Sequence, residues 1–366
     1  MTNVFTADAD DSVELHAGSR RDFTGATMGE ADLGMIGPQQ CCELGPVAIV
    51  AGGLSHEREV SLMSGQRILG ELRALGIDAE VVDADAAFLH ALREGRFAAV
   101  LPTIHGDIGE DGSLQTVLEF SGIPFTGSPS GACRLAWDKA VARTITERAG
   151  LPCPQWAALS SSSFKELGGT EVVRHLVEDM AWPLVTKPNR GGSVLGVRGV
   201  TSVDQLPSAL LQAFAFGETA VIESLTQGLD VSVAVVELDG VARPGEPVGL
   251  DYDSTDQFEF EARYDAARIQ VLAPAPVSAE TRNALRKAAE TAHRALGLRD
   301  LSRADFLVGD NGEFVLLEVA VAPGLTETSL FPFSVEAAGW PLGVVFARLL
   351  QRAIERSSPR QKSQLP

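Results

Sequence analysis

The stretch ADFLVGDNGEFVLLEVAVAPG, which covers residues 304–324, decides how the C-terminal part of this chain folds. It is strongly apolar but carries one acid, Asp305, near its start and another, Glu318, near its end. Asn311-Gly312 at its centre is the strongest short-range signal for a β-hairpin. We therefore predict two antiparallel strands joined by a two-residue turn.

This hairpin brings the two acids face to face. Counting outward from the turn, Asp305 lies opposite Glu318, and Arg303 lies opposite Ala320. Because side chains alternate along a strand, these four residues share one face. The other face is then a core surface, formed by Ala304, Phe306, Val308, Val315, Leu317 and Val319.

Two carboxylates that face each other across strands repel, and an isolated buried carboxylate is costly, so each acid needs a partner. A divalent cation between them would meet both needs. Hard oxygen ligands in this number suit Mg²⁺, which usually binds one or two carboxylates together with substrate phosphates. The alternative is that one acid pairs with Arg303 and the other with a base elsewhere in the chain.

The composition is that of an ordinary globular protein of 366 residues, with 45 % apolar and 22 % charged residues. Its net charge of −19 argues against a nucleic-acid backbone or an anionic membrane as the main partner. No apolar run reaches the roughly 18–20 residues that cross a bilayer, and the N-terminus lacks a signal-peptide pattern. The four cysteines have no metal-ligand spacing, so we expect a reducing, cytoplasmic setting.

The order of apolar runs, glycine turns and helical periods predicts an α/β protein, α+β in part. Residues 1–44 have weak periodicity and are interpreted as an extension, expected to be flexible. Strands and helices alternate over 45–135, which predicts a parallel sheet covered by helices. A second α/β region is expected over 136–222 and a third over 223–366. The serine run at 160–163 is interpreted as a loop.

Only five of the 30 basic residues are lysines, so a lysine near a glycine-rich loop is informative. Lys187 ends a predicted strand and precedes such a loop, which contains Gly191, Gly192, Ser193 and Gly196. A loop of this kind can bring backbone N–H groups close to phosphate, with lysine as a point charge. Lys139 lies in a helix predicted over 132–150. The alternatives are an ordinary glycine-rich hairpin and a solvated lysine.

Further polar residues lie where predicted strands begin or end, or in polar stretches nearby: Glu57, His105, Glu223, Asp230, Arg263 and Tyr264. Ligands of parallel sheets bind beyond the carboxyl ends of the strands. Glu57 and the loop HGDIGEDGS (105–113) are therefore candidates for a substrate site. The alternatives are an acid at a helix N-terminus, a plain loop before a helix, and a surface turn.

In chain order the motifs are a glycine-turn carboxylate, His-Gly…Gly-Glu-Asp-Gly, Asp-Lys, Lys-Pro with a Gly/Ser loop, an acid pair at a strand end, Arg-Tyr, Arg-x-Asp-Phe and Glu…Pro-Gly-x-Thr. Their collinear order resembles the D-alanine–D-alanine ligase family of the ATP-grasp fold over about residues 46–355. The resemblance implies three α/β domains, with ATP between the central and C-terminal ones. It also implies a cytoplasmic homodimer that acts on small molecules, not on nucleic acid or a membrane.

The resemblance further implies a role for each candidate. Nucleotide contacts would come from Lys139, Lys187, Gly191, Gly192, Ser193, Glu223 (adenine) and Asp230 (ribose). Mg²⁺ would be held by Asp305 and Glu318. Catalytic contacts would come from Glu57, Ser193, Tyr264, Arg303 and the Gly324 N–H. The amino-acid substrates would contact Glu57, His105, Arg263 and Ser329.

The implied reaction is ATP-dependent ligation of two amino acids through an acyl phosphate, with D-Ala-D-Ala as the default product. Three features depart from the family pattern. Ala320 stands where the family has the asparagine that completes a second Mg²⁺ site, Arg263 stands where lysine is usual, and the extension over 1–44 has no counterpart. The departures leave open a specialised dipeptide ligase of natural-product or resistance chemistry, and a nucleotide-binding pseudo-ligase without turnover.

Overall fold

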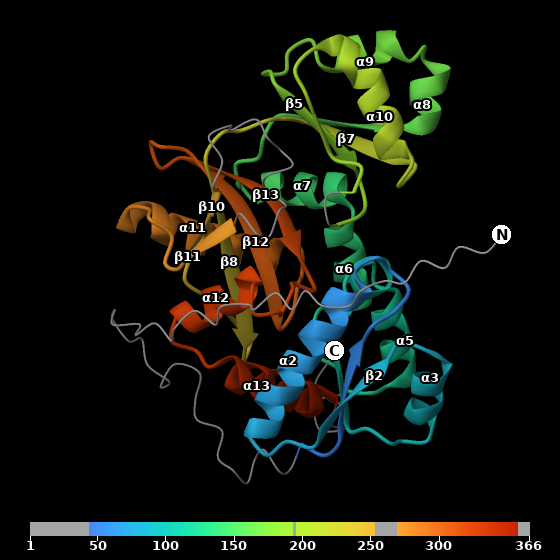
Figure 1. Cartoon of the computed structure of the whole chain (residues 1–366), viewed down its shortest axis with the longest axis vertical. Helices are drawn as coiled ribbons and strands as arrows, with labels where there is room; N and C mark the ends of the chain where they lie inside the picture. Colours follow the sequence, from blue (N-terminus) through green and yellow to red (C-terminus); the bar gives the residue numbers. More distant parts are fainter. Residues whose placement is uncertain (1–43, 193–194, 253–268, 358–366) are drawn as a thin grey trace, which may run out of the picture.

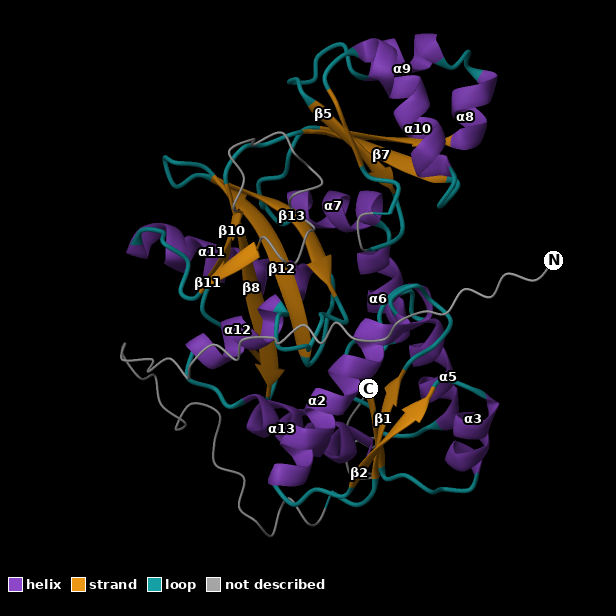
Figure 2. Cartoon of the chain, viewed as in Figure 1, coloured by secondary structure: helices purple, strands orange, loops and turns teal. Residues whose placement is uncertain are grey.

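The structure, a computed structural model, describes residues 44–192, 195–252 and 269–357. Its strands form three sheets. Figure 1 shows a four-stranded sheet with its helices at one end of the molecule, a large sheet in the middle and a small parallel sheet at the other end. Figure 2 shows that helices lie beside each of the three sheets. This is the α/β architecture that the sequence predicted.

The small sheet is parallel, with the strand order β2-β1-β3. Every residue of the central strand is buried, which is typical of a parallel strand covered on both faces. This confirms the parallel sheet expected near the N-terminus. Its elements are β1 (Val47–Ala51), α2 (Arg58–Ala74), β2 (Ala79–Asp83), α3 (Ala86–Arg93), β3 (Ala99–Pro102), α4 (Asp107–Glu110) and α5 (Ser113–Ser121).

The last residue of the expected N-terminal extension packs against this sheet. Leu44 is only 5 % exposed and belongs to the apolar core that also contains Val47 and Ile49. The expectation of a flexible segment is therefore wrong at residue 44, because an apolar side chain just before β1 reaches the core. Residues 1–43 lie outside the described part of the chain.

The helix predicted over 132–150 is in fact two helices, α6 (Ser130–Trp137) and α7 (Lys139–Arg148). The break lies at Asp138, whose backbone is extended (φ −86°, ψ 101°) and whose side chain accepts a hydrogen bond from Val141 N. Aspartate in such a position caps the next helix, so the chain turns there and Lys139 begins α7. Side chains of both helices pack on the core of the large sheet. The sequence had instead suggested that the central region begins at residue 136, within these helices. The domain boundaries themselves stay predictions.

The four-stranded sheet is antiparallel, in the order β4-β7-β5-β6. Its three helices fill a separate core together with Leu184 and Ile222. The serine run predicted as a loop instead ends β4 and begins α8, because the Ser160 hydroxyl accepts from Ser163 N and caps the helix. The elements are β4 (Trp156–Ser160), α8 (Ser161–Glu166), α9 (Thr170–Leu176), β5 (Leu184–Pro188), β6 (Arg198–Val200), α10 (Leu206–Phe214) and β7 (Thr219–Ser224).

The large sheet has the order β11-β10-β8-β12-β13, with β9 paired to β8. Alternate residues of β8 serve two cores: Val233 packs on the side of α11, and Ala234 on the side of α12, α13 and α2. The second core is thus shared with the parallel sheet. The elements are β8 (Leu229–Leu238), β9 (Val241–Pro244), β10 (Val248–Tyr252), β11 (Ile269–Leu272), α11 (Ala279–Ala295), β12 (Leu301–Val308), β13 (Phe314–Ala320), α12 (Leu330–Ala337) and α13 (Leu342–Ser357).

The hairpin of β12 and β13 pairs Asp305 with Glu318, as predicted. The predicted turn is wrong: Gly309 N donates to Glu313 O at 2.8 Å, so the turn is one residue longer than Asn311-Gly312. A β-bulge after Asp305 then shifts the register by one residue and restores the predicted pairing. The two deviations cancel at the acid pair.

The bulge also changes which side chains of β13 face the core. Leu316 is 3 % exposed and lies among the core residues, whereas Val315 and Leu317 are partly exposed. The prediction that placed Val315 and Leu317 on the core surface is wrong, because the extra residue of the bulge reverses the alternation before Glu318.

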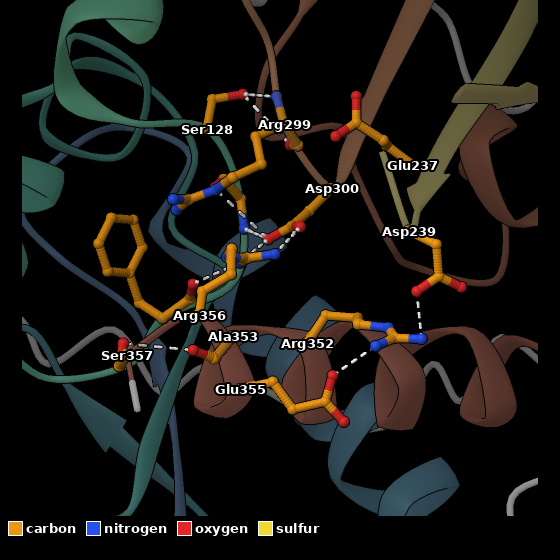
Figure 3. Close-up of polar contacts among 12 residues, drawn as sticks. Ser128, Glu237, Asp239, Arg299, Asp300, Arg352, Ala353, Glu355, Arg356 and Ser357 are labelled. Atoms are coloured by element: carbon orange, nitrogen blue, oxygen red, sulfur yellow. Dashed lines mark hydrogen bonds and ion pairs between the residues drawn. The ribbon is translucent and has the colours of Figure 1, made fainter. Parts of the chain in front are cut away.

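A buried carboxylate joins the parallel sheet, the large sheet and the last helix (Figure 3). Asp300, directly before β12, accepts from Gly127 N at 2.9 Å and from both terminal nitrogens of Arg356 at 2.7 and 2.8 Å. Arg299 Nε donates to Gly127 O at 2.8 Å. The Asp300 backbone is left-handed (φ 65°), which is uncommon outside glycine. These contacts fix the start of the strand that carries Arg303.

Within the described residues, no single helix is long and apolar enough to cross a bilayer. Helices α12 and α13 meet the length and composition requirement only as a pair, and they are bent by 98° relative to each other. One phenylalanine of each helix, Phe331 in α12 and Phe346 in α13, is buried in the core, with 0 % and 1 % of its surface exposed.

Candidate functional site

A cavity of about 440 Å³ lies between the four-stranded sheet and the large sheet. Its lining comes from β5, β7 and the glycine-rich loop on one side and from β8, β12 and β13 on the other. The structure brings together here most of the residues that the sequence indicated: Glu57, Lys139, Lys187, Gly191, Gly192, Glu223, Asp230, Arg303, Asp305 and Glu318. Segments far apart in the chain therefore meet at one cavity.

Two lysines face this cavity from different elements. Lys139, the first residue of α7, donates from Nζ to Gly191 O at 2.7 Å, and its Nζ lies 3.8 Å from Glu318 Oε2. Burial lowers the pKa of Lys139, while the charge of Glu318 acts in the opposite direction. Lys187 in β5 places its Nζ 2.7 Å from Glu223 Oε1. Both ammonium groups are thus held by oxygens that an anionic ligand can replace.

Glu223 in β7 is a buried carboxylate held between two cations. Lys187 contacts its Oε1, and Arg143 Nη2 lies 2.6 Å from its Oε2. Burial alone would raise the pKa of Glu223, but the charges of Lys187 and Arg143 outweigh it and lower that pKa. Sequence reasoning missed Arg143, although it lies four residues after Lys139 and so on the same helix face.

Arg303 and Asp305 lie two residues apart on β12 and form a two-point ion pair, with Nε–Oδ1 and Nη2–Oδ2 distances of 2.8 and 2.7 Å. The Ser232 hydroxyl donates to the same Oδ1 at 2.6 Å. Burial works against the charge of Arg303, but Asp305 and nearby Glu318 outweigh it and raise the pKa of Arg303. This is the pairing that the sequence left open as the alternative to metal.

The acid pair still fits one divalent cation. Glu318 lies directly opposite Asp305, its side chain is 45 % exposed, and both acids line the cavity. Their oxygens are hard donors, and Mg²⁺ needs only one or two carboxylates when phosphate and water complete its shell. Within the described residues, no group of three or more His, Cys, Asp or Glu side chains has metal-site geometry. Ala320, opposite Arg303, adds a methyl group and no ligand atom.

Two acids lie at the end of the site that adjoins the parallel sheet. Glu57 directly precedes α2, and a Cβ added at Gly106 would come within 2.9 Å of its Oε2, so glycine there allows a close approach. Glu110, which the sequence reasoning did not single out, accepts from Gly106 N at 2.9 Å. Burial raises the pKa of Glu110 to about 8, with further contributions from Glu57 and Glu318. Its presence in an acidic loop was visible in the sequence, but its partial burial was not.

Three other candidates lie beside the cavity rather than in its lining. The His105 ring is buried and contacts Ser64 Oγ and Ala322 O, each at 3.0 Å; burial lowers its pKa. The Ser329 hydroxyl accepts from Thr326 N at 3.0 Å, directly before α12. Gly324 lies close to Ser329, since a Cβ added to it would meet Ser329 Oγ at 2.7 Å. Three further candidates lie outside the described residues: Ser193, Arg263 and Tyr264.

Two lysines, a glycine loop and a facing acid pair, in a cavity between two antiparallel sheets, are the features of a nucleotide-dependent ligase with the ATP-grasp fold. Residues 145–353, more than half of the chain, match the family model described as D-ala D-ala ligase C-terminus. The chain belongs to this family. It is therefore an ATP-dependent amino-acid ligase, and Mg²⁺ is the usual metal of such enzymes.

Solved structures share this fold over nearly their whole length. The VanG D-Ala:D-Ser ligase from Enterococcus faecalis is 24 % identical, with a TM-score of 0.72 over 86 % of this chain and 99 % of that chain. D-alanyl-alanine synthetase A from Vibrio cholerae is 22 % identical, with a TM-score of 0.74 over 85 % and 98 %. The D-alanine–D-alanine ligase from Bacillus anthracis, complexed with ATP, is 26 % identical, with a TM-score of 0.68 over 88 % and 100 %.

Proposed function

We propose that the protein joins two amino acids into a dipeptide through an acyl phosphate, with ATP bound in the cavity between the four-stranded and large sheets. The observation that carries the proposal is that Lys139, Lys187 and Arg303 line one cavity together with the acid pair Asp305 and Glu318. Three cations beside two metal-competent acids suit a triphosphate that transfers its terminal group.

The base of the nucleotide would lie against β7. Glu223 lines the cavity, and its buried Oε2, which lies 2.6 Å from Arg143 Nη2, has a second lone pair that can accept a further hydrogen bond. An exocyclic amino group is a donor that suits this oxygen. Asp230 lines the same cavity at the start of β8, where a ribose hydroxyl would reach it.

The phosphates would lie between the lysines and the acid pair. Lys139 and Lys187 exchange their present contacts for phosphate oxygens, and the backbone of Gly191 and Gly192 approaches them closely. Mg²⁺, held by Asp305 and Glu318, would neutralise charge that builds on the phosphate oxygens. Arg303, oriented by Asp305, is a fixed cation for the charge that develops as the phosphoryl group moves.

The amino acids would bind at the end of the cavity near α2. Glu57 holds the ammonium group of the first amino acid, whose carboxylate takes the γ-phosphoryl group; the amine of the second then attacks. Arg303 and the Gly324 N–H stabilise the oxyanion, and His105, Arg263 and Ser329 help to place the substrates. By the resemblance to the family, Ser193 and Tyr264, which lie outside the described residues, are assigned to the same step as Glu57. Water must be excluded, because an acyl phosphate hydrolyses.

The test is a panel of D- and L-amino acids mixed with the protein and Mg-ATP, with ADP release and dipeptide mass as readouts. We expect D-alanine to stimulate ADP release and to give D-Ala-D-Ala. Release with a different pair of amino acids would identify a specialised dipeptide ligase. If ATP binds but no amino acid of the panel stimulates ADP release, the protein is a pseudo-ligase, the outcome that Ala320 favours.

We also propose a division into an N-terminal domain over 45–135, a central domain over 136–222 and a C-terminal domain over 223–366. Figure 1 supports the central one, since the four-stranded sheet and its helices form a separate lobe. A cytoplasmic homodimer is proposed by analogy with the family. Light scattering of the purified chain tests the dimer.

A further inference from the structure

Behind the base end of the cavity lies an arginine that has no role in the mechanism above. We infer that Arg143 is a positioning residue: it holds Glu223 as a fixed, ionised acceptor and so makes the site select a purine with a 6-amino group over one with a 6-oxo group. This inference rests on the proposed contact between adenine and Glu223.

The surroundings of Arg143 leave its guanidinium one orientation. Its side chain is 3 % exposed, and Nη2 lies 2.6 Å from Glu223 Oε2 and 3.2 Å from Leu317 O. The guanidinium carbon lies 5.7 Å from the centre of the Trp156 ring, within range of a cation–π contact. Contacts with β7, β13 and β4 thus fix the guanidinium of Arg143 from three sides. The guanidinium in turn fixes the carboxylate of Glu223.

Arg143 and Lys187 both counterbalance the negative charge of Glu223, but only Arg143 is expected to do so when ATP is bound. Lys187 lines the cavity, and in the proposed function it turns to a phosphate when ATP binds. Glu223 then needs another counter-charge, because an isolated buried carboxylate is costly. Arg143 is not part of the cavity lining, so a phosphate bound in the cavity does not draw it away from Glu223.

A carboxylate that is kept ionised in this way distinguishes a 6-amino purine from a 6-oxo purine by hydrogen bonding. It accepts hydrogen bonds and donates none, so it pairs with the 6-amino group of adenine and repels the lone pairs of a 6-oxo group. The lowered pKa of Glu223, where burial alone would raise it, agrees with a carboxylate that stays ionised near neutral pH. Without Arg143, protonation would let Glu223 donate to a 6-oxo group, and free rotation would weaken the contact with adenine.

The experiment measures the affinity of the full chain for ADP and for IDP, which differ at the 6-position, by titration calorimetry. We expect the unaltered chain to prefer ADP and Arg143→Met to reduce the ADP:IDP preference by roughly tenfold or more, mainly through weaker ADP binding. Arg143→Lys keeps the charge without the fork and should give a smaller loss. Arg148→Met, an exposed arginine on the same helix, is the matched control and should leave both affinities unchanged.

A merely structural role predicts a different pattern. If Arg143 only supports the fold, Arg143→Met and Arg143→Lys lower the midpoint of thermal unfolding and weaken ADP and IDP equally, which overturns the inference. Arg143→Met added to Glu223→Gln should cause no further change in the ratio, since the arginine acts through that acid. If Arg143→Met does not fold, an unchanged ADP:IDP ratio in Arg143→Lys overturns the inference. Failure of the unaltered chain to bind ADP would overturn the proposed function as well.

Discussion

Replacement of Lys187 by alanine tests two contacts of this lysine: the ion pair with Glu223 in the free protein and the expected contact with a phosphate in the nucleotide complex. In the structure its Nζ contacts Glu223 at 2.7 Å, with the two side chains 11 % and 8 % exposed. Breaking a buried ion pair usually costs about 3–5 kcal/mol, but Arg143 stays in contact with Glu223, so we expect about 1–2 kcal/mol of lost stability. In the bound state the variant also loses a charge-assisted phosphate contact, which is equivalent to roughly tenfold to hundredfold in affinity.

The assay combines calorimetric titration with ADP, ADP production from Mg-ATP, and urea unfolding. Lys165→Ala is the matched control, because Lys165 is exposed on α8 and does not line the cavity. We expect Lys187→Ala to lower both stability and nucleotide affinity and the control to lower neither. Unchanged ADP affinity together with unchanged ADP production would refute the assignment of Lys187 to the phosphates.

Three further predictions concern the metal, the N-terminus and pH. Ala320→Asn should sharpen the Mg²⁺ dependence and raise turnover by roughly tenfold to a hundredfold, because it adds an oxygen ligand on the Glu318 face; Glu318→Gln in that background should abolish the gain. Removal of residues 1–43 should preserve cooperative unfolding, whereas Leu44→Ala should cost about 2–3 kcal/mol in urea unfolding because the side chain is buried; equal stability of Leu44→Ala would contradict its place in the core. Hydrogen bonding by Arg58 lowers the pKa of Asp83 to about 2, so this acid stabilises the fold above about pH 4 and loses that effect as the pH falls toward 2. Asp83→Asn should therefore destabilise most near neutral pH, by at most about 1 kcal/mol for so exposed a pair. If the difference in stability does not shrink between pH 4 and pH 2, the stabilisation does not depend on protonation of Asp83 in that range.

The acid pair shows how local sequence can lead to a correct contact through an incomplete argument. The Asn-Gly signal predicted a hairpin at the right place and paired Asp305 with Glu318. The turn is one residue longer than predicted, and a bulge compensates for it. The bulge could not be predicted because it depends on packing: Leu316, not Leu317, fills the core beneath β13.

Helix boundaries show the same limit. The helical period over 132–150 correctly indicates helix, but it does not reveal the break at Asp138. In the sequence Asp138 looks like an ordinary polar residue on the exposed face of one continuous helix. Its side chain caps α7, and Arg190 contacts it from the glycine-rich segment. The cap turns Lys139 toward Gly191, so a capping residue of ordinary appearance determines where a site residue points.

By itself the sequence determined the features that depend on local periods and on the order of motifs: the parallel sheet, the hairpin with facing acids, the lysines beside a glycine loop, and the resemblance to a ligase family. Only the tertiary structure decided which charges meet. Arg143 reaches Glu223, Lys139 approaches Glu318, and Glu110 is partly buried beside the site. The physical reason is that an ion pair or a shifted pKa depends on burial between segments far apart in the chain, and no local period of hydrophobic residues records that burial.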